Sequence, residues 1–115
     1  MRLFGRRARP GTARQADGAD TAHLVAFARS HAGVEAFVEP PTAVTATTVM
    51  LVAGSGEWTR RRVPSVEWAH DFANSHGIPS YDAAVVGYPQ RMREWNAARR
   101  GNDGAARGGA GGAST

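Results

Sequence analysis

Cysteine and lysine are both absent from this 115-residue chain, so all fourteen of its basic residues are arginine. The lack of cysteine excludes disulfide bonds, thiol nucleophiles and cysteine-ligated metal ions, and it gives no sign of an oxidising compartment. Long apolar runs are also lacking, since none approaches the ~18 residues that cross a membrane. The sequence therefore predicts a protein without transmembrane segments, and a cytoplasmic location is expected.

Large apolar side chains are scarce at both ends of the chain. After the first methionine, residues 1–18 contain only Leu3 and Phe4, and residues 101–115 contain none. Neither segment can bury enough apolar surface to offset the entropy lost on ordering, so both are expected to be disordered. The remaining residues, 19–100, form a single predicted domain, of a size that buries roughly 60% of its unfolded surface.

The positive charge of the chain is concentrated in the N-terminal segment. Within residues 1–18, five arginines stand against Asp17, which accounts for the formal net charge of +4. Within residues 19–100, eight arginines balance three aspartates and five glutamates, so the predicted domain is neutral. The run RRAR at 6–9 is either a contact for nucleic acid or another anionic surface, or a solvated segment that aids solubility.

Hydrophobic periodicity and turn signals predict seven elements in the domain. The organising segment is TTVMLVAGSGEWTRRRV (47–63), which is typical of a β-hairpin with a Gly-Ser-Gly turn. Its first strand is apolar on both faces at 49–52, which indicates a central position in the sheet. The other predicted elements are helices over 20–32, 65–76 and 89–100 and strands over 34–39 and 81–87. Ser65 is the expected N-cap of the second helix, and Gly77 is the expected left-handed residue after its end. The order αβββαβα predicts an α+β fold, with helices packed on a mostly antiparallel four-stranded sheet.

The sequence contains no motif for catalysis, metal binding or cofactor binding. Its histidines form no His-Glu-x-x-His arrangement, and His70 and His76 lie about 240° apart around a helix, so they cannot share an ion from one face. Ser55 lacks the strand–elbow–helix setting that activates a serine, and no dinucleotide fingerprint occurs. No catalytic residue, metal or cofactor is therefore predicted, and a protein that is not an enzyme is favoured.

Two short segments contain more arginine and aromatic residues than a scaffold needs. On the second hairpin strand, Trp58, Arg60 and Arg62 share one face, where a guanidinium group can stack on an indole and still bind an anion. The segment GYPQRMR (87–93) begins the last helix, and helix N-termini attract anions. Its candidate binding residues are Tyr88, Gln90, Arg91 and Arg93. The alternatives are an edge strand that charge protects from aggregation, and a packing helix with surface arginines.

Three stretches of the domain resemble a small actinobacterial protein family of uncharacterised function, which has the motif IPxYD…GYPQRMR. They are VEAFVEPPTAV (34–44), GEWTRRRVP (56–64) and IPSYDAAVVGYPQRMREWN (78–96), and the similarity covers most of residues 19–97. The resemblance implies a shared fold and an actinobacterial source. Members of the family often carry an oxidoreductase label, but no flavin, nicotinamide or redox-metal motif accompanies the resemblance in this sequence.

The sequence leads to three functional hypotheses. The first is a non-enzymatic accessory module that binds an acidic partner (nucleic acid, ribonucleoprotein or an acidic protein surface) through the arginine-rich segments. The second is a small enzyme, such as an oxidoreductase, with a pocket beside Tyr81, Asp82 and Tyr88. The third is a structural subunit, a homodimer whose marginal core is completed by self-association through an edge strand.

Overall fold

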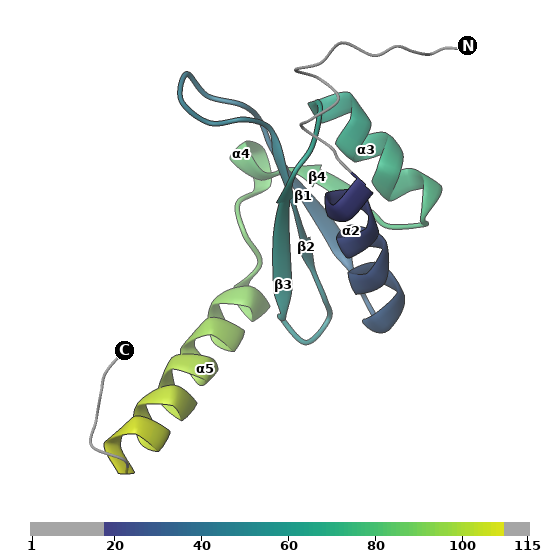
Figure 1. Ribbon diagram of the computed structural model, residues 1–115. Helices are drawn as coiled ribbons and strands as arrows, with labels where there is room; N and C mark the ends of the chain where they lie inside the picture. The colour runs from purple at the N-terminus through teal and green to yellow at the C-terminus, as the bar shows by residue number, and fades with distance from the viewer. Residues whose placement is uncertain (1–17, 110–115) are drawn as a thin grey trace.

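A four-stranded sheet with helices on both of its faces makes up the molecule (Figure 1). The structure is a computed structural model that describes residues 18–109, with side chains up to residue 101. The sequence-based predictions for residues 1–17 and 110–115 lie outside this part of the chain. In chain order the elements are α2 (Gly18–Ser30), β1 (Glu35–Glu39), β2 (Thr48–Val52), β3 (Trp58–Arg62), α3 (Val66–Ser75), β4 (Ser80–Asp82), α4 (Ala83–Val86) and α5 (Gln90–Gly109).

The strands lie in the order β3-β2-β1-β4, so β3 and β4 form the two edges of the sheet. Strand β2 pairs antiparallel with both β1 and β3, whereas β4 runs parallel to β1. This mostly antiparallel sheet confirms the predicted α+β fold. The predicted central position of β2 is also confirmed, because Val49–Val52 are completely buried. In the described part of the chain, no helix combines the length and apolar character needed to cross a bilayer.

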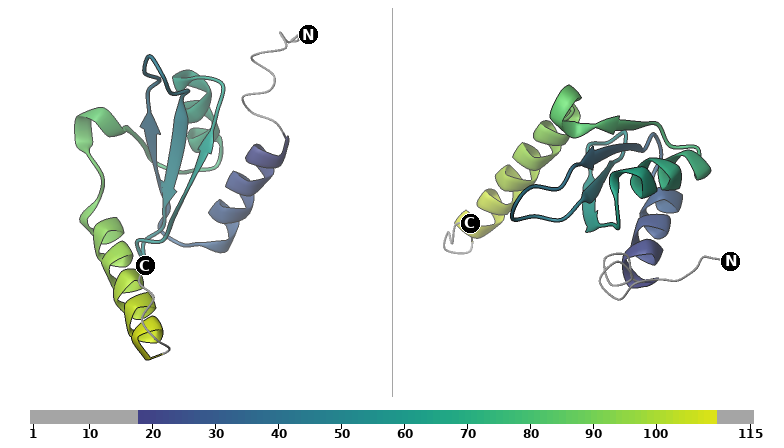
Figure 2. Two further views of the ribbon diagram at one scale, coloured as in Figure 1. Left: turned by 60° about the vertical axis from the view of Figure 1, so that its left-hand side comes forward. Right: turned by 90° about the horizontal axis from the view of Figure 1, so that it is seen from above.

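The sheet separates two apolar clusters, because successive side chains of a strand point to opposite faces. On one face α2 and α3 pack over the strands, and Leu24 and Phe72 contact buried strand residues such as Leu51. The opposite face carries a smaller cluster, and α4 and α5 cover it with Ala83 and Met92. Figure 2 shows the sheet between the α2–α3 pair and α5. Each fully buried aliphatic side chain contributes roughly 2 kcal/mol of transfer free energy to this arrangement.

The ends of α3 follow the predicted capping signals. The Ser65 hydroxyl accepts a hydrogen bond from the Trp68 N–H at 3.0 Å, which satisfies a free donor of the first turn. After the last turn, Gly77 has a φ of +68°, and the Ile78 N–H donates to the Ala73 carbonyl at 2.8 Å. The left-handed glycine and the backward bond end the helix at the predicted residue.

The predicted strand over residues 81–87 is wrong for most of its length. Strand β4 has only three residues, and the next four form the short helix α4. The Asp82 carboxylate accepts a hydrogen bond from the Ala84 N–H at 2.8 Å and so begins a helix where the apolar run starts. Val85 is 80% exposed, so this apolar run does not form a strand buried in the sheet.

Helix α5 continues to Gly109, beyond Arg100, where the sequence analysis ends the domain. Its first turns pack on the sheet through the buried Met92, and the indole N–H of Trp58 donates to Asn96 Oδ1 at 2.8 Å. The later turns extend away from the sheet (Figure 1). The domain therefore holds α5 by its N-terminal half.

The hairpin turn between β2 and β3 touches the backbone of α5. Gly56 has a φ of +97°, and a Cβ atom on it would lie 2.1 Å from the Arg91 carbonyl oxygen and 2.8 Å from Trp95 Cβ. Of the two turn glycines, Gly56 has a positive φ and Gly54 does not. Position 56 therefore requires glycine both for its backbone conformation and for the close approach of α5.

We expect Gly56→Ala to lower the free energy of unfolding by roughly 3 kcal/mol, because its methyl group collides with α5 and its backbone conformation disfavours an L side chain. Gly77→Ala is the matched control, since Gly77 also has a positive φ but has no atom within 4 Å of a built Cβ. That variant should lose only about 1 kcal/mol. Denaturant unfolding followed by tryptophan fluorescence measures both values. Equal losses would show that the contact between the turn and α5 does not matter for stability.

Candidate functional site

Two glutamates of β1 organise the sheet face on which α5 packs, called the α5 face below. Because side chains alternate along a strand, Glu35, Phe37 and Glu39 all lie on this face. Each glutamate binds one arginine and one tyrosine, and the buried Phe37 lies between the two glutamates along β1. The α5 face therefore carries two clusters of the same composition, one toward each end of β1.

At the C-terminal end of β1, Glu39 binds Arg60 across the intervening strand β2. Nε and Nη2 of Arg60 donate to the two carboxylate oxygens at 2.8 Å and 3.0 Å, a bidentate geometry that suits arginine and not lysine. The Thr48 hydroxyl donates to the same carboxylate at 2.6 Å, and the Tyr88 hydroxyl also donates to it. The Arg60 guanidinium lies over the Trp58 ring, 5.5 Å from its centroid.

The surroundings of Glu39 favour its ionised form. Burial alone would raise the pKa of Glu39, but hydrogen bonds from Arg60, Thr48 and Tyr88, together with the Arg60 charge, hold the pKa below its ordinary value. The hydrogen bond to Glu39 raises the pKa of Arg60, and likewise the pKa of Tyr88. The cluster is therefore an ion pair at neutral pH, and the Arg60 charge is already neutralised within the domain.

At the N-terminal end of β1, Glu35 binds Arg91 of α5. Nη2 of Arg91 donates to Glu35 Oε1 at 2.7 Å, and the Tyr81 hydroxyl donates to the other carboxylate oxygen at 2.9 Å. Arg91 also donates to the carbonyl oxygens of Ala53 (2.9 Å) and Val52 (3.3 Å). The hydrogen bond with Glu35 raises the pKa of Tyr81. Arg91 thus joins the start of α5 to β1 and to the end of β2.

The other predicted binding residues make local contacts or none. Arg62 is exposed and forms no hydrogen bond or ion pair with any residue that the structure describes. Gln90 Nε2 donates to Glu94 Oε2 at 3.3 Å within α5, and Arg93 Nη1 donates to the Tyr88 carbonyl at 3.1 Å. Both of these side chains lie on the exposed side of the helix.

The seven predicted residues therefore do not converge on one open site. Arg60 and Arg91 do share a sheet face, as the anion-site hypothesis requires, but each is bound to a different glutamate. Their partners Glu35 and Glu39 were not predicted from the sequence. The signal was present in the alternation of EAFVE, which places both acids on the same face as a buried phenylalanine. A carboxylate in such a position needs a cation or hydrogen-bond donors.

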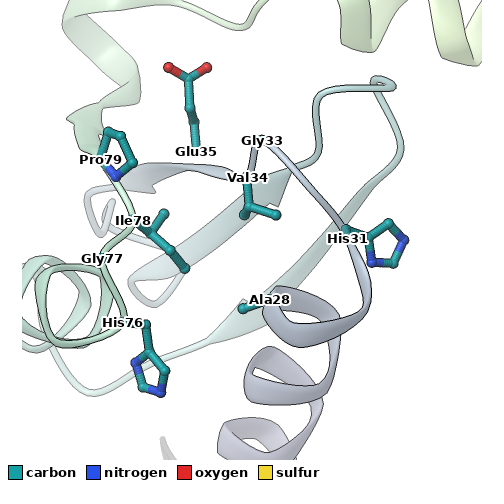
Figure 3. Close-up of a pocket in the computed structure, with 9 residues that line it drawn as sticks. All are labelled: Ala28, His31, Gly33, Val34, Glu35, His76, Gly77, Ile78 and Pro79. Carbon is teal, nitrogen blue, oxygen red and sulfur yellow. The ribbon is translucent and has the colours of Figure 1, made fainter.

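A hollow of about 480 Å³ lies near the C-terminal ends of α2 and α3, and Glu35 forms part of its lining (Figure 3). Figure 3 shows Ala28, Val34 and Ile78 at its centre and His31 and His76 at its margins. Each histidine Nδ1 lies 2.9 Å from the phenylalanine carbonyl oxygen four residues earlier, and the rings do not point toward each other. Among residues 18–101 no group of three or more histidine, aspartate and glutamate side chains could hold a metal ion.

A smaller hollow of about 220 Å³ lies beside Tyr81 and Tyr88, where the enzyme hypothesis places its pocket. Phe37, Val86 and Pro89 complete much of its lining. Its two tyrosine hydroxyls are already bonded to the glutamates of β1. The third residue of that hypothesis, Asp82, does not line the hollow, and its carboxylate instead begins α4.

Comparisons with protein-family models, with curated proteins and with solved structures give no match. The ion pairs between described residues include His31–Glu57, Arg60–Glu39, Arg61–Asp20 and Arg91–Glu35.

The two tyrosines of the chain report on the two glutamate clusters, because each donates to one glutamate. Ionisation of such a phenol would place two negative charges side by side, so its pKa is raised. Ultraviolet absorbance should therefore show both phenols ionising above their ordinary pKa of about 10. Glu39→Gln should lower the pKa of Tyr88 alone, and Glu35→Gln that of Tyr81 alone.

The same bonds make stability depend on pH in the alkaline range. A pKa that is higher in the folded state contributes stability below the unfolded-state value, and this contribution is lost as the pH rises through the folded-state value. The wild type should therefore lose stability above pH ~10 more steeply than either glutamine variant. A tyrosine titration that neither substitution changes would contradict the described bonds.

Proposed function

We propose that this protein is a binding module for an acidic protein partner, without an enzymatic activity of its own. The observation that carries the proposal is the run of three arginines on β3, at the edge of the sheet. Arg60 is paired with Glu39, and Arg61 Nε lies 3.4 Å from Asp20 Oδ1. Arg62 is exposed and has no carboxylate partner within the described range. Its charge is therefore available to a partner.

Charge balance favours a protein over nucleic acid as this partner. Residues 18–101 contain eight arginines against three aspartates and five glutamates, so the formal charges cancel. Nucleic acid binding depends on several cations that follow a phosphate backbone. The arginines without an acidic partner in the described part of the chain come from three separate elements: Arg29 from α2, Arg62 from β3, and Arg93, Arg99 and Arg100 from α5. One exposed arginine at a sheet edge suits a short acidic segment of a protein.

We expect Arg62→Glu to weaken the binding of fluorescently labelled poly-glutamate by about tenfold at low salt, because it replaces an attraction with a repulsion. Arg29→Glu is the matched control, since it makes the same charge change at an exposed position on α2 and should have little effect. Fluorescence anisotropy at low and at physiological salt measures both affinities. The wild-type affinity should fall as salt rises.

The arginine-rich N-terminal residues would attract any polyanion, so every variant should also carry Arg6→Gln, Arg7→Gln and Arg9→Gln in the full-length chain. A single-stranded RNA of matched charge serves as the second ligand. Equal losses for Arg62→Glu and Arg29→Glu would contradict the proposal. Tighter binding of the RNA than of poly-glutamate would reassign the partner to nucleic acid.

A further inference from the structure

The hydrogen bonds that flank β3 show which of its backbone groups face β2. Before the strand, the Ala53 N–H donates to the Glu57 carbonyl at 2.8 Å, and after it the Val63 N–H donates to the Thr47 carbonyl at 3.0 Å. Hydrogen-bonded and non-hydrogen-bonded pairs alternate along an antiparallel ladder. The odd-numbered residues from 57 to 63 therefore use their N–H and C=O groups to bind β2.

The even-numbered residues Trp58, Arg60 and Arg62 consequently direct their backbone groups away from the sheet. One of these groups has a partner: Arg61 Nη1 donates to the Arg60 carbonyl at 2.9 Å. The others make no hydrogen bond to the residues that the structure describes. A row of free N–H and C=O groups at a sheet edge is a template for a further strand.

Side chains of β3 are held by contacts on both faces of the sheet, while the outer edge of the strand is not paired with another strand. On the α5 face, Trp58 is bonded to Asn96 and Arg60 to Glu39. On the opposite face, the Thr59 hydroxyl lies 2.5 Å from Nε2 of His23 in α2. A strand that is already ordered loses little conformational freedom when a partner pairs with it.

We propose that β3 binds an extended acidic segment of the partner protein as a fifth strand of the sheet. This inference rests on the proposed function and specifies how the partner is recognised. Backbone hydrogen bonds to Trp58, Arg60 and Arg62 supply the pairing, and a carboxylate opposite Arg62 supplies the charge selectivity. The other edge is a poor alternative, because β4 has three residues and α4 follows it directly.

Charge excludes the two other occupants that the chain itself offers. A second copy paired antiparallel through β3 would bring Arg60 opposite the Arg60 of its partner if the pairing were centred on residue 60, or Arg62 opposite Arg60 if it were centred on residue 61. Like charges that face each other across strands are destabilising. The N-terminal residues 1–18 contain five arginines and one aspartate, so they are repelled in the same way. An acidic segment from another protein is the occupant whose charge complements the edge.

Backbone pairing can be separated from charge attraction with two peptides. The first peptide is an acetylated and amidated Val-Glu repeat. The second has the same sequence, but its alternate amide nitrogens are methylated. Methylation keeps the charge of the peptide and removes the backbone N–H donors along one of its edges. The full-length protein is used with the N-terminal glutamine substitutions given above. The unmethylated peptide should bind about threefold to tenfold more tightly, the effect of one or a few net hydrogen bonds. On binding, the amides of Trp58, Arg60 and Arg62 should gain protection from hydrogen exchange, while those of Thr59 and Arg61 should stay as protected as before.

Two substitutions at position 62 test the backbone pairing by changing the protein instead of the peptide. Arg62→Gln removes the charge and keeps the outward N–H; Arg62→Pro removes both, and the lost N–H makes no bond to the rest of the described fold. Proline is tolerated at such outward positions of edge strands. Arg62→Pro should therefore bind the unmethylated peptide more weakly than Arg62→Gln. Circular dichroism and thermal unfolding confirm that both variants fold.

The outcomes distinguish the two proposals. Equal affinity for the two peptides, with salt dependence and the loss in Arg62→Glu intact, would overturn strand addition and leave the acidic partner in place. Failure of poly-glutamate and both peptides to bind would overturn both proposals. If the β3 amides of the free protein became more protected from hydrogen exchange as the protein concentration rises, the strand that pairs with β3 would be a second copy of the chain. That result would overturn the proposal of an acidic partner segment.

Discussion

The carboxylates of Glu35 and Glu39 are the constraint on which one whole side of this structure depends. Each takes an arginine from a distant part of the chain: Arg60 lies 21 residues from Glu39, and Arg91 lies 56 residues from Glu35. The same carboxylates accept hydrogen bonds from the two tyrosines that flank α4. Through these contacts, β1 holds the chain segment around α4 and the start of α5 against the sheet. Removal of either glutamate would leave an arginine of this face without its carboxylate partner.

This arrangement gives the arginines of the domain different roles, although they look alike in the sequence. Arg60 and Arg91 are neutralised by β1, and the indole N–H of Trp58 is bonded to α5, so the expected anion site is largely occupied by the protein's own groups. What stays open is the outer edge of β3 with the exposed Arg62 at its end. The binding proposal therefore rests on a strand edge, and the internal ion pairs contribute by holding that strand in place.

Much of the fold follows from local signals in the sequence, because those signals act over a few residues. The buried strand at 49–52, the hairpin turn and the caps of α3 were all predicted and are all found. The exposed run at 83–86 was predicted as a strand from its apolar composition, and the capping role of Asp82 at the start of α4 was not foreseen. The glutamate partners of the arginines were not predicted, because the Arg60–Glu39 pair depends on the order of the strands in the sheet and the Arg91–Glu35 pair on where α5 lies on it. The collision at Gly56 depends on the same placement.

Arg60 stabilises the fold whereas Arg62 is proposed to bind the partner, and a comparison of glutamine substitutions at the two positions tests this difference most directly. Arg60→Gln and Arg62→Gln make the same chemical change two residues apart on one strand face, and each is measured both for unfolding free energy and for affinity toward the Val-Glu peptide. Arg60→Gln should lose about 1 kcal/mol of stability, because its partly exposed ion pair is broken, and should keep its affinity. Arg62→Gln should keep its stability within about 0.5 kcal/mol and lose affinity severalfold. An Arg60→Gln variant that is fully stable but binds the peptide as weakly as Arg62→Gln would contradict the account.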